Sequence, residues 1–256
     1  MLPLDGIGVL VTRPEQQAMS LCRLLEAQGA ATLRLPAIEI KPCGKRHMSN
    51  ARVGQLDDFN LIVFTSANAV RFGSALLEQR QDLTLAAIGP ATARALNQFG
   101  YRVAVQPEAG FDSESLLIHP QLEQISGQRI LLIKGSNGRR LLEQEFVRRG
   151  AQVVSIDVYE RTPTQPSAAE LAAVQSNIEA GRLHVITATS VDIGSRLLEM
   201  VSRAELHKLR WLVPGERVAA ALRRRGLLAP VVTAASADDQ DLVAALLRWR
   251  SDESDA

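Results

Sequence analysis

The sequence lacks the residues from which metal and disulfide sites are usually built. It has two cysteines, Cys22 and Cys43, whose number and spacing do not suit a metal cluster. Its four histidines are scattered along 256 residues. None of the histidines stands beside a nucleophile or at a metal-ligand spacing from another ligand. We therefore expect no metal site, and we predict that Cys22, on the apolar face of the first helical pattern, is a core thiol.

The sequence also lacks a large net charge and any long apolar segment. A formal net charge of +1 provides no field that would attract nucleic acid or an anionic membrane. No apolar run approaches the roughly 18 residues of a membrane span, and the start MLPLDGIG has no charged-then-apolar signal. We expect a cytoplasmic protein that binds neither nucleic acid nor membrane.

Motifs of the common catalytic and nucleotide sites are absent too. LLIKGSNGR is not a P-loop, because Gly138 is followed by Arg139 and Arg140 and not by Lys and Ser or Thr. IGPATARAL lacks GxGxxG, and no HExxH, GxSxG or paired-carboxylate pattern occurs. We therefore expect a chemistry that uses no metal and no redox cofactor.

What the sequence does contain is an internal repeat, so that one unit of about half the chain is written twice. The matching stretches are 9–42 with 130–163 (Gly29 on Gly150, an offset of 121), 60–70 with 184–193 (Ser66 on Ser190, an offset of 124) and 86–96 with 210–222 (Pro90 on Pro214).

Short apolar runs alternate with helical patterns in both copies. This alternation predicts an α/β fold with lobes of parallel sheet flanked by helices, of the flavodoxin-like kind. The predicted strands include 8–12, 61–64, 85–88, 103–105, 185–188, 211–213 and 231–233, and the predicted helices include 15–28, 91–99, 167–180, 217–225 and 238–248.

Two equivalent extended segments, 32–42 and 153–163, follow the first helix of each copy. If they pair as a two-stranded antiparallel ribbon, the halves cross: one lobe holds 1–35 plus 164–256, and the other holds 36–163. The simpler alternative gives each repeat its own lobe, 1–125 and 126–256. Both stay open, but a dozen residues of ribbon in each copy favour the crossed version.

Small and polar residues stand at six strand-to-helix junctions, where backbone N–H groups are available to an anion. Each such residue more often only caps its helix, but six donor clusters facing one cleft would suit a large ligand with many anionic groups. The junctions are Thr12-Arg13-Pro14, Thr65-Ser66-Ala67-Asn68, Gly89-Pro90-Ala91-Thr92, Lys134-Gly135-Ser136-Asn137-Gly138, Thr189-Ser190 and Pro214-Gly215-Glu216.

Tyr159 is one of two tyrosines and lies in the second ribbon segment, where Ile38 stands in the first. Its ring could simply pack, with its hydroxyl hydrogen-bonded. Alternatively, the phenol faces the cleft as a weak general acid.

The ordered set VTRP, FTSANAV, AIGPATARAL, KGSNGR with RGAQV, VYERT and PGERVAAAL, over residues 8–247, resembles uroporphyrinogen-III synthase. The resemblance implies two α/β lobes joined by a two-stranded ribbon. It also implies a cofactor-independent lyase acting on hydroxymethylbilane, a linear tetrapyrrole with eight carboxylates. Loss of the terminal hydroxyl leaves an azafulvene, which the substituted carbon of the last pyrrole attacks. The resulting spiro intermediate fragments and recloses with that ring inverted.

By position, the resemblance makes Tyr159 the catalytic residue that assists departure of the hydroxyl. The substrate-binding residues it implies are Arg13, Thr65, Ser66, Ala67, Thr92, Lys134, Gly135, Ser136, Ser190, Pro214 and Gly215. Glu216 departs from the threonine-rich turn, commonly GPTTA, of many relatives. We expect a monomer that takes its substrate from the upstream bilane-forming enzyme. The alternatives are a non-catalytic two-lobed binding protein for a polyanionic small molecule, and a nucleotide-sugar or phosphoryl transferase.

Overall fold

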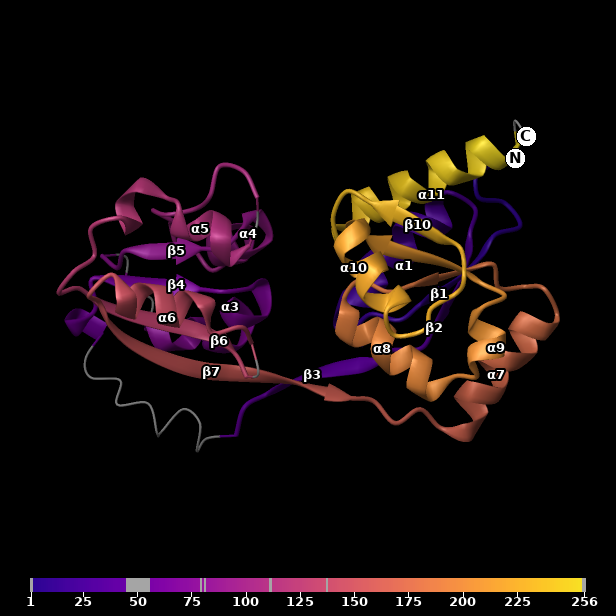
Figure 1. Cartoon of the computed structure of the whole chain (residues 1–256), viewed down its shortest axis with the longest axis horizontal. Coiled ribbons are helices and arrows are strands. Elements are labelled where there is room, and N and C mark those ends of the chain that lie inside the picture. The colour runs from indigo at the N-terminus through magenta and orange to yellow at the C-terminus, as the bar shows by residue number, and fades with distance from the viewer. Residues whose placement is uncertain are drawn as a thin grey trace. The chain divides into compact units, whose positions relative to one another are not determined.

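The computed structural model describes residues 2–44, 56–78, 80, 82–110, 112–136 and 138–254 (Figure 1). The chain divides into two compact units: unit 1 is Met1–Glu39 with Thr162–Ala256, and unit 2 is Ile40–Arg161. The lobe boundaries expected from the repeat, 1–35 with 164–256 and 36–163, stay a prediction.

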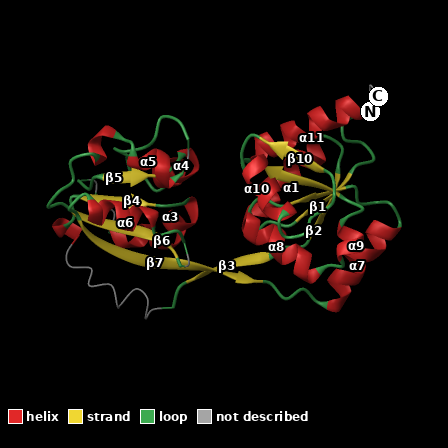
Figure 2. Ribbon diagram, viewed as in Figure 1, coloured by secondary structure: helices red, strands yellow, loops and turns green. Residues whose placement is uncertain are grey.

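Unit 1 is an open parallel sheet with helices on both faces (Figure 2). Its strands lie in the order β10-β9-β8-β1-β2, and all the described pairings are parallel. Counted as the chain visits them, this is the 2-1-3-4-5 order of flavodoxin-like folds. The elements are β1 (Gly8–Val11), α1 (Glu15–Ala27), β2 (Ala31–Arg34), α7 (Ala168–Glu179), β8 (Val185–Thr187), α8 (Val191–Met200), α9 (Arg203–Leu206), β9 (Arg210–Pro214), α10 (Gly215–Arg223), β10 (Val231–Ala234) and α11 (Asp239–Ser254).

Alternation along β1 explains why this sheet is covered on both faces. Val9 and Val11 pack on one face with the apolar residues of α1 and α11, and Leu10 packs on the other with those of α7, α8, α9 and α10. Cys22 of α1 is buried in the first of these clusters, which confirms the predicted core thiol, and burial raises its pKa.

Unit 2 repeats the layout. Its sheet runs β3-β7-β6-β4-β5, with α3, η2 and α4 packed on one face and α5, η3 and α6 on the other. The elements are β3 (Ile38–Pro42), η1 (Leu56–Asp58), β4 (Leu61–Phe64), α3 (Ala67–Gly73), η2 (Ser74–Leu77), β5 (Leu85–Ala87), α4 (Pro90–Gln98), α5 (Ser113–Leu117), η3 (Pro120–Leu122), β6 (Arg129–Gly135), α6 (Leu141–Arg148) and β7 (Gln152–Pro163).

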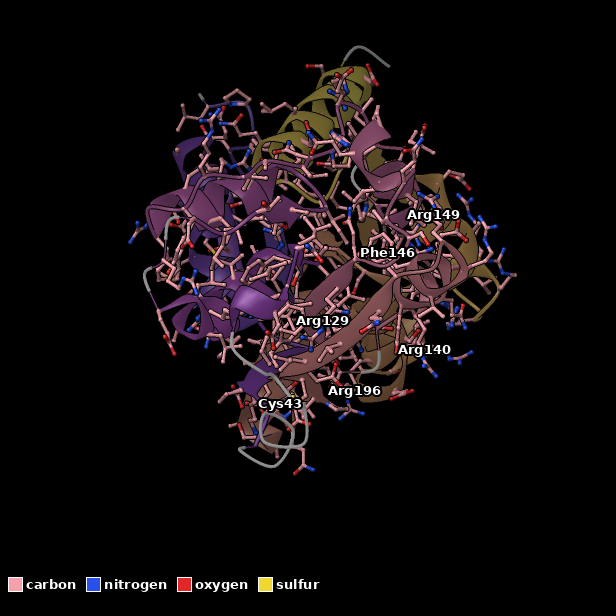
Figure 3. All side chains as sticks on the ribbon, turned by 90° about the vertical axis from the view of Figure 1, so that its left-hand side faces the viewer. Cys43, Arg129, Arg140, Phe146, Arg149 and Arg196 are labelled. Carbon is pink, nitrogen blue, oxygen red and sulfur yellow. The ribbon has the colours of Figure 1, made fainter. Side chains whose placement is uncertain are left out.

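Arg149, labelled near Phe146 in Figure 3, ties α6 to α5 and η3. Its guanidinium donates to the backbone oxygens of Leu117 at 2.8 Å and Leu122 at 2.7 Å, and to the Glu145 carboxylate at 2.9 Å. The buried Phe146 holds the same helix on the sheet. α6 is therefore fixed by both apolar packing and an internal cation.

The strand registers confirm the repeat. Gly8 pairs with Ala31 in unit 1, and Arg129 pairs with Gln152 in unit 2, so both strands shift by 121 residues. The first helix of each copy also ends the same way, at Gly29 (φ +94°) and Gly150 (φ +85°). Glycine adopts this left-handed conformation without the clash that a Cβ would cause.

Two predictions were wrong, one about the overlay of the two copies and one about a strand. Pro90 begins α4, whereas Pro214 ends β9 and α10 begins one residue later at Gly215. The predicted overlay of these prolines is thus wrong, because one proline opens a helix and the other closes a strand. The predicted strand 103–105 is reduced to a single bridge between Val105 and Ala86. Pro107, which has no N–H, follows too closely for a longer ladder.

β3 and β7 form the predicted antiparallel ribbon. The Cys43 N–H donates to the Val158 oxygen at 3.1 Å, and the Thr164 N–H donates to the Ala37 oxygen at 3.1 Å. One residue number rises while its partner's falls, which defines antiparallel pairing.

No helix within the described residues is long and apolar enough to cross a membrane.

Candidate functional site

In sheets with this strand order, ligands bind where the order reverses, beyond the carboxyl ends of the central strands. In unit 2 this point lies between β4 and β6, and in unit 1 between β8 and β1. The predicted junctions divide between these places. Thr65, Ser66, Ala67, Gly135 and Ser136 belong to the first, and Arg13 and Ser190 to the second.

Tyr159 stands at the unit 2 reversal point. It is 4% exposed, its ring stacks on Phe72 of α3 with centroids 6.1 Å apart, and its hydroxyl lies 3.1 Å from the Ser66 Oγ. The Arg161 guanidinium lies 5.9 Å from the ring centroid, within cation–π range. The phenol is thus held on its ring and at its hydroxyl, and only a small part of its surface is open to a ligand.

Gly135 makes room for that ring. A Cβ built on Gly135 would lie 2.5 Å from the tyrosine Cζ, closer than real atoms approach. The register between β6 and β7 also shifts between Lys134 and Gly135, where Gly135 pairs with Tyr159. A side chain at this position would therefore displace the phenol.

Ser66 links the tyrosine to a helix start. It is the N-cap of α3, and its Oγ accepts from the Ala69 N–H at 3.1 Å, which satisfies one donor of the first turn. Thr65 anchors the preceding turn, because its N–H donates to the Ile133 oxygen at 3.1 Å. Ala67 opens the helix itself.

The other face of this junction carries charges that neutralise each other. The Lys134 Nζ lies 2.8 Å from the Asp157 Oδ1. The Ser136 N–H donates to the backbone carbonyl oxygen of Tyr159 at 2.8 Å. Burial, together with Asp157 and Glu160, raises the pKa of the nearby Cys43 thiol. The junction's Asn137 lies outside the described residues.

At the unit 1 reversal point Thr12 and Arg13 form hydrogen bonds within this chain. The Thr12 N–H donates to the Thr187 Oγ1 at 3.2 Å, and the Thr12 hydroxyl donates to the backbone carbonyl oxygen of Thr187. The buried Arg13 donates to the Asp239 carboxylate and to the Ala237 oxygen. Arg13 was predicted as a partner for substrate carboxylates, but the structure gives its guanidinium a carboxylate of this chain.

The remaining predicted residues lie at helix starts. Ser190 caps α8, with its Oγ 3.2 Å from the Ile193 N–H, and Thr92 is buried in the first turn of α4. Pro214 precedes α10, which begins at Gly215 with φ +76° and has no side-chain cap. Glu216 pairs with Arg223 at 2.5 Å on the same helix, so its negative charge is partly offset.

Sequence reasoning missed Phe72 and Asp239. Phe72 lies one turn beyond Ala69 on the helix that Ser66 caps, so an aromatic residue in VRFG was a signal for a ring partner. Asp239 is 226 residues from Arg13 in the chain and no local pattern connects them.

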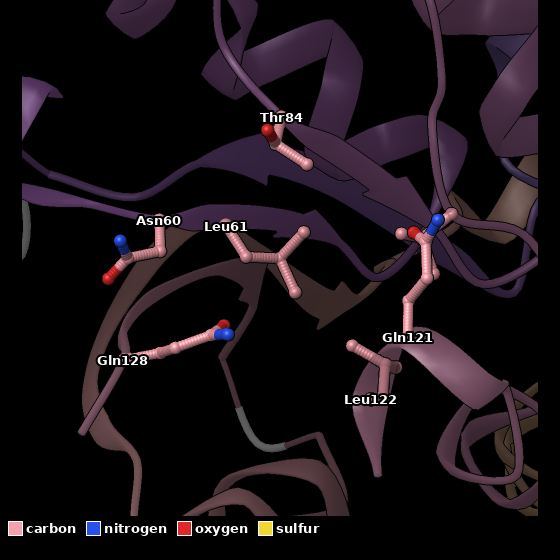
Figure 4. Close-up of a pocket in the computed structure, with 7 residues that line it drawn as sticks. Asn60, Leu61, Thr84, Gln121, Leu122 and Gln128 are labelled. Atoms are coloured by element: carbon pink, nitrogen blue, oxygen red, sulfur yellow. The ribbon is translucent and has the colours of Figure 1, made fainter. Parts of the chain in front are cut away.

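A separate cavity of about 190 Å³ opens at the amino ends of β4, β5 and β6 (Figure 4). Tyr159 lies at the other end of this sheet, paired with Gly135 where β6 ends. Part of its polar lining is already engaged, since the Asn60 Oδ1 accepts from the Arg129 N–H at 2.8 Å. None of the predicted site residues lines it. The lining residues are Asn60, Leu61, Thr84, Val105, Gln121, Leu122 and Gln128.

Comparison with known proteins gives a consistent result. The family described as "Uroporphyrinogen-III synthase HemD" matches residues 20–244. The uroporphyrinogen-III synthase of Salmonella typhimurium is 30% identical, covering 94% of this chain and 100% of its own, and that of Escherichia coli is 28% identical with the same coverage.

Solved structures carry the same fold. A mutant uroporphyrinogen III synthase from Thermus thermophilus aligns with a TM-score of 0.63 at 20% identity, covering 98% of this chain and 100% of its own. The Helicobacter pylori enzyme aligns with a TM-score of 0.62 at 16% identity, covering 95% and 99%. By the family match over most of its length, this chain belongs to the uroporphyrinogen-III synthase family.

Proposed function

We propose that this chain is a lyase that cyclises hydroxymethylbilane to uroporphyrinogen III without a cofactor, inverting the last pyrrole ring and releasing water. The observation that carries the proposal is the family match over residues 20–244, with relatives of that name aligned along nearly their whole length. The reaction belongs to tetrapyrrole biosynthesis.

The chemistry needs a proton at one point above all. The terminal hydroxyl of the bilane leaves as water only when it is protonated, and its departure creates the azafulvene that the substituted pyrrole carbon then attacks. We assign this proton transfer to Tyr159. Its support is geometric: the phenol O–H is fixed at the unit 2 reversal point, 3.1 Å from the Ser66 Oγ and beside the start of α3.

The remaining steps need a constrained substrate more than further acids and bases. The bilane also closes spontaneously to the wrong isomer, so binding must hold one conformation of the chain. Backbone N–H groups at the starts of α4 and α10, which have no side-chain cap, are suitable donors to substrate carboxylates. We propose as substrate-binding residues Thr65, Ala67, Thr92, Gly135 and Ser136 of unit 2 and Ser190, Pro214 and Gly215 of unit 1.

We further propose that the protein acts as a cytoplasmic monomer and takes its unstable substrate from the upstream bilane-forming enzyme. The alternative, a non-catalytic binding protein for a polyanion, makes a different prediction about the products. Neither Arg13 nor Lys134 is proposed as the principal carboxylate contact, because each already pairs with an internal carboxylate.

Isomer analysis tests the reaction. Hydroxymethylbilane is generated in situ, the protein is added, and the oxidised products are separated into uroporphyrins I and III. We expect isomer III to predominate, against isomer I in the blank. Isomer I alone, from protein shown by circular dichroism to be folded, would refute the catalytic proposal and leave the binding role.

A further inference from the structure

Ser66 and Ser190 occupy equivalent places in the two copies, and both cap the helix that follows. The Ser66 Oγ accepts from the Ala69 N–H at 3.1 Å, and the Ser190 Oγ accepts from the Ile193 N–H at 3.2 Å. They differ in one contact. The Ser66 Oγ also lies 3.1 Å from the Tyr159 hydroxyl, and within the described residues Ser190 has no aromatic counterpart.

The direction of that hydrogen bond decides what the phenol can do. Each hydroxyl has one proton to donate and two lone pairs. If Tyr159 donates to Ser66, the phenol proton is occupied and the Ser66 proton needs another acceptor. If Ser66 donates to Tyr159, the phenol proton stays available for a substrate.

One contact favours Ser66 as the donor. The Ala69 N–H already donates to the Ser66 Oγ, which polarises the Ser66 O–H and makes it a better donor. The Tyr159 hydroxyl has no corresponding donor among the contacts of the described residues.

The contact is also held rigidly on both sides. Ser66 is fixed by capping α3, and Phe72 of the same helix stacks on the Tyr159 ring at 6.1 Å. From the strand side, Gly135 leaves space for the ring and for nothing larger. One short helix therefore sets both the plane of the ring and the partner of its hydroxyl.

We infer that Ser66 is a positioning residue for the reaction: its hydroxyl donates to Tyr159 and leaves the phenol proton directed at the departing hydroxyl of the substrate. Ser66 need not contact the substrate. This inference rests on the proposed function and on the role proposed there for Tyr159.

A double-mutant cycle on kcat tests it, with steady-state rates measured by isomer III formation. Tyr159→Phe is expected to lower kcat about 100-fold, the lower end of what a general acid contributes. Ser66→Ala is expected to lower kcat about tenfold, with KM changed less, as for loss of one positioning hydrogen bond. In the Tyr159→Phe background, Ser66→Ala should lower kcat no further. Ser66→Thr, which keeps both the cap and the O–H, should restore most of the rate.

Ser190→Ala is the matched control, because it removes the same kind of cap from the equivalent helix. Any effect it has on kcat should multiply with that of Tyr159→Phe. If Ser66→Ala also multiplies with Tyr159→Phe, the serine acts through the helix or the substrate and the inference is overturned. If Tyr159→Phe leaves kcat unchanged, the role of the phenol and the inference fall together, while continued formation of isomer III would keep the reaction itself.

Discussion

The two reversal points differ in chemistry although the repeat makes them equivalent in position. In unit 1, Thr12 and Thr187 are fully buried and exchange hydrogen bonds between β1 and β8. Their counterparts in unit 2 are Ile133 and Val63, both fully buried and apolar. In the ribbon the contrast is reversed, because Tyr159 of the second copy matches Ile38 of the first.

This contrast shows that equivalent positions in the two copies of a duplicated fold can take different roles. Thr12 and Thr187 are fully buried and hydrogen-bonded to each other, so they are closed to a ligand and serve the sheet. In unit 2 the sheet interior is apolar and the polar atoms lie further out, where the Ser66 and Tyr159 hydroxyls meet. The duplicated backbone kept both reversal points, and side-chain changes made them unequal.

The largest effect that would test the comparison is the loss of the strand-ending cations. Arg13→Met should cost about 3 kcal/mol, because it leaves Asp239, whose side chain is 18% exposed, unpaired and removes the donor to the Ala237 oxygen. Lys134→Met should cost about 1 kcal/mol, because Asp157 is 28% exposed and Lys134 is tied at one contact. Urea unfolding of each variant measures the difference.

Tryptophan fluorescence reports unit 1 alone in this measurement, since both tryptophans, Trp211 and Trp249, lie there. Peptide-resolved amide hydrogen exchange reports unit 2. Arg13→Lys is the matched control: it keeps the charge but cannot span two acceptors, so we expect an intermediate loss. Equal losses of unfolding free energy for Arg13→Met and Lys134→Met would mean that the two ion pairs stabilise the protein to the same extent.

A smaller effect is expected from Gly135→Ala. The new Cβ would lie 2.5 Å from the Tyr159 Cζ, so we expect about 2 kcal/mol of destabilisation from overpacking, together with a lower kcat as the phenol moves away from Ser66. Gly44→Ala is the control, because a Cβ there meets nothing within 4 Å and its φ is ordinary. Unfolding free energies and single-turnover rates that do not distinguish the two variants would contradict the close packing of the ring.

The fold could be predicted from the sequence because its signals are local and occur twice. The apolar strands, the helix ends at Gly29 and Gly150 and the offset of 121 residues reappear in the strand registers. Serine at the junctions predicted N-caps, which Ser66 and Ser190 form. Where the two copies show the same pattern, a signal that is weak in one copy is supported by the other.

The partners within the site could not be predicted, because they join residues far apart in the chain. Ser66 and Tyr159 are 93 residues apart, and Arg13 and Asp239 are 226 apart. Periodicity says which face of a strand is buried, but it does not say which side chain from another element arrives there. Arg13 was therefore predicted as a substrate contact while its carboxylate partner in this chain went unseen.

The smallest effect concerns acid and the helices α1 and α6. Hydrogen bonds from Arg148 and then Arg149 lower the pKa of Glu145 from its ordinary 4.5 to about 2, whereas the equivalent position in α1 is Leu24. A carboxyl whose pKa is lower in the folded state stabilises that state fully above its unfolded pKa, and the contribution is lost as the pH falls toward about 2. Glu145→Gln should therefore flatten the fall in unfolding free energy between pH 4.5 and about 2 and leave the slope above that range unchanged. Urea denaturation across this range, followed by exchange at the peptides of α6 and of α1, measures it, with α1 as the internal control. An unchanged acid slope at α6 in the variant would show that the Glu145 pairs do not persist in solution.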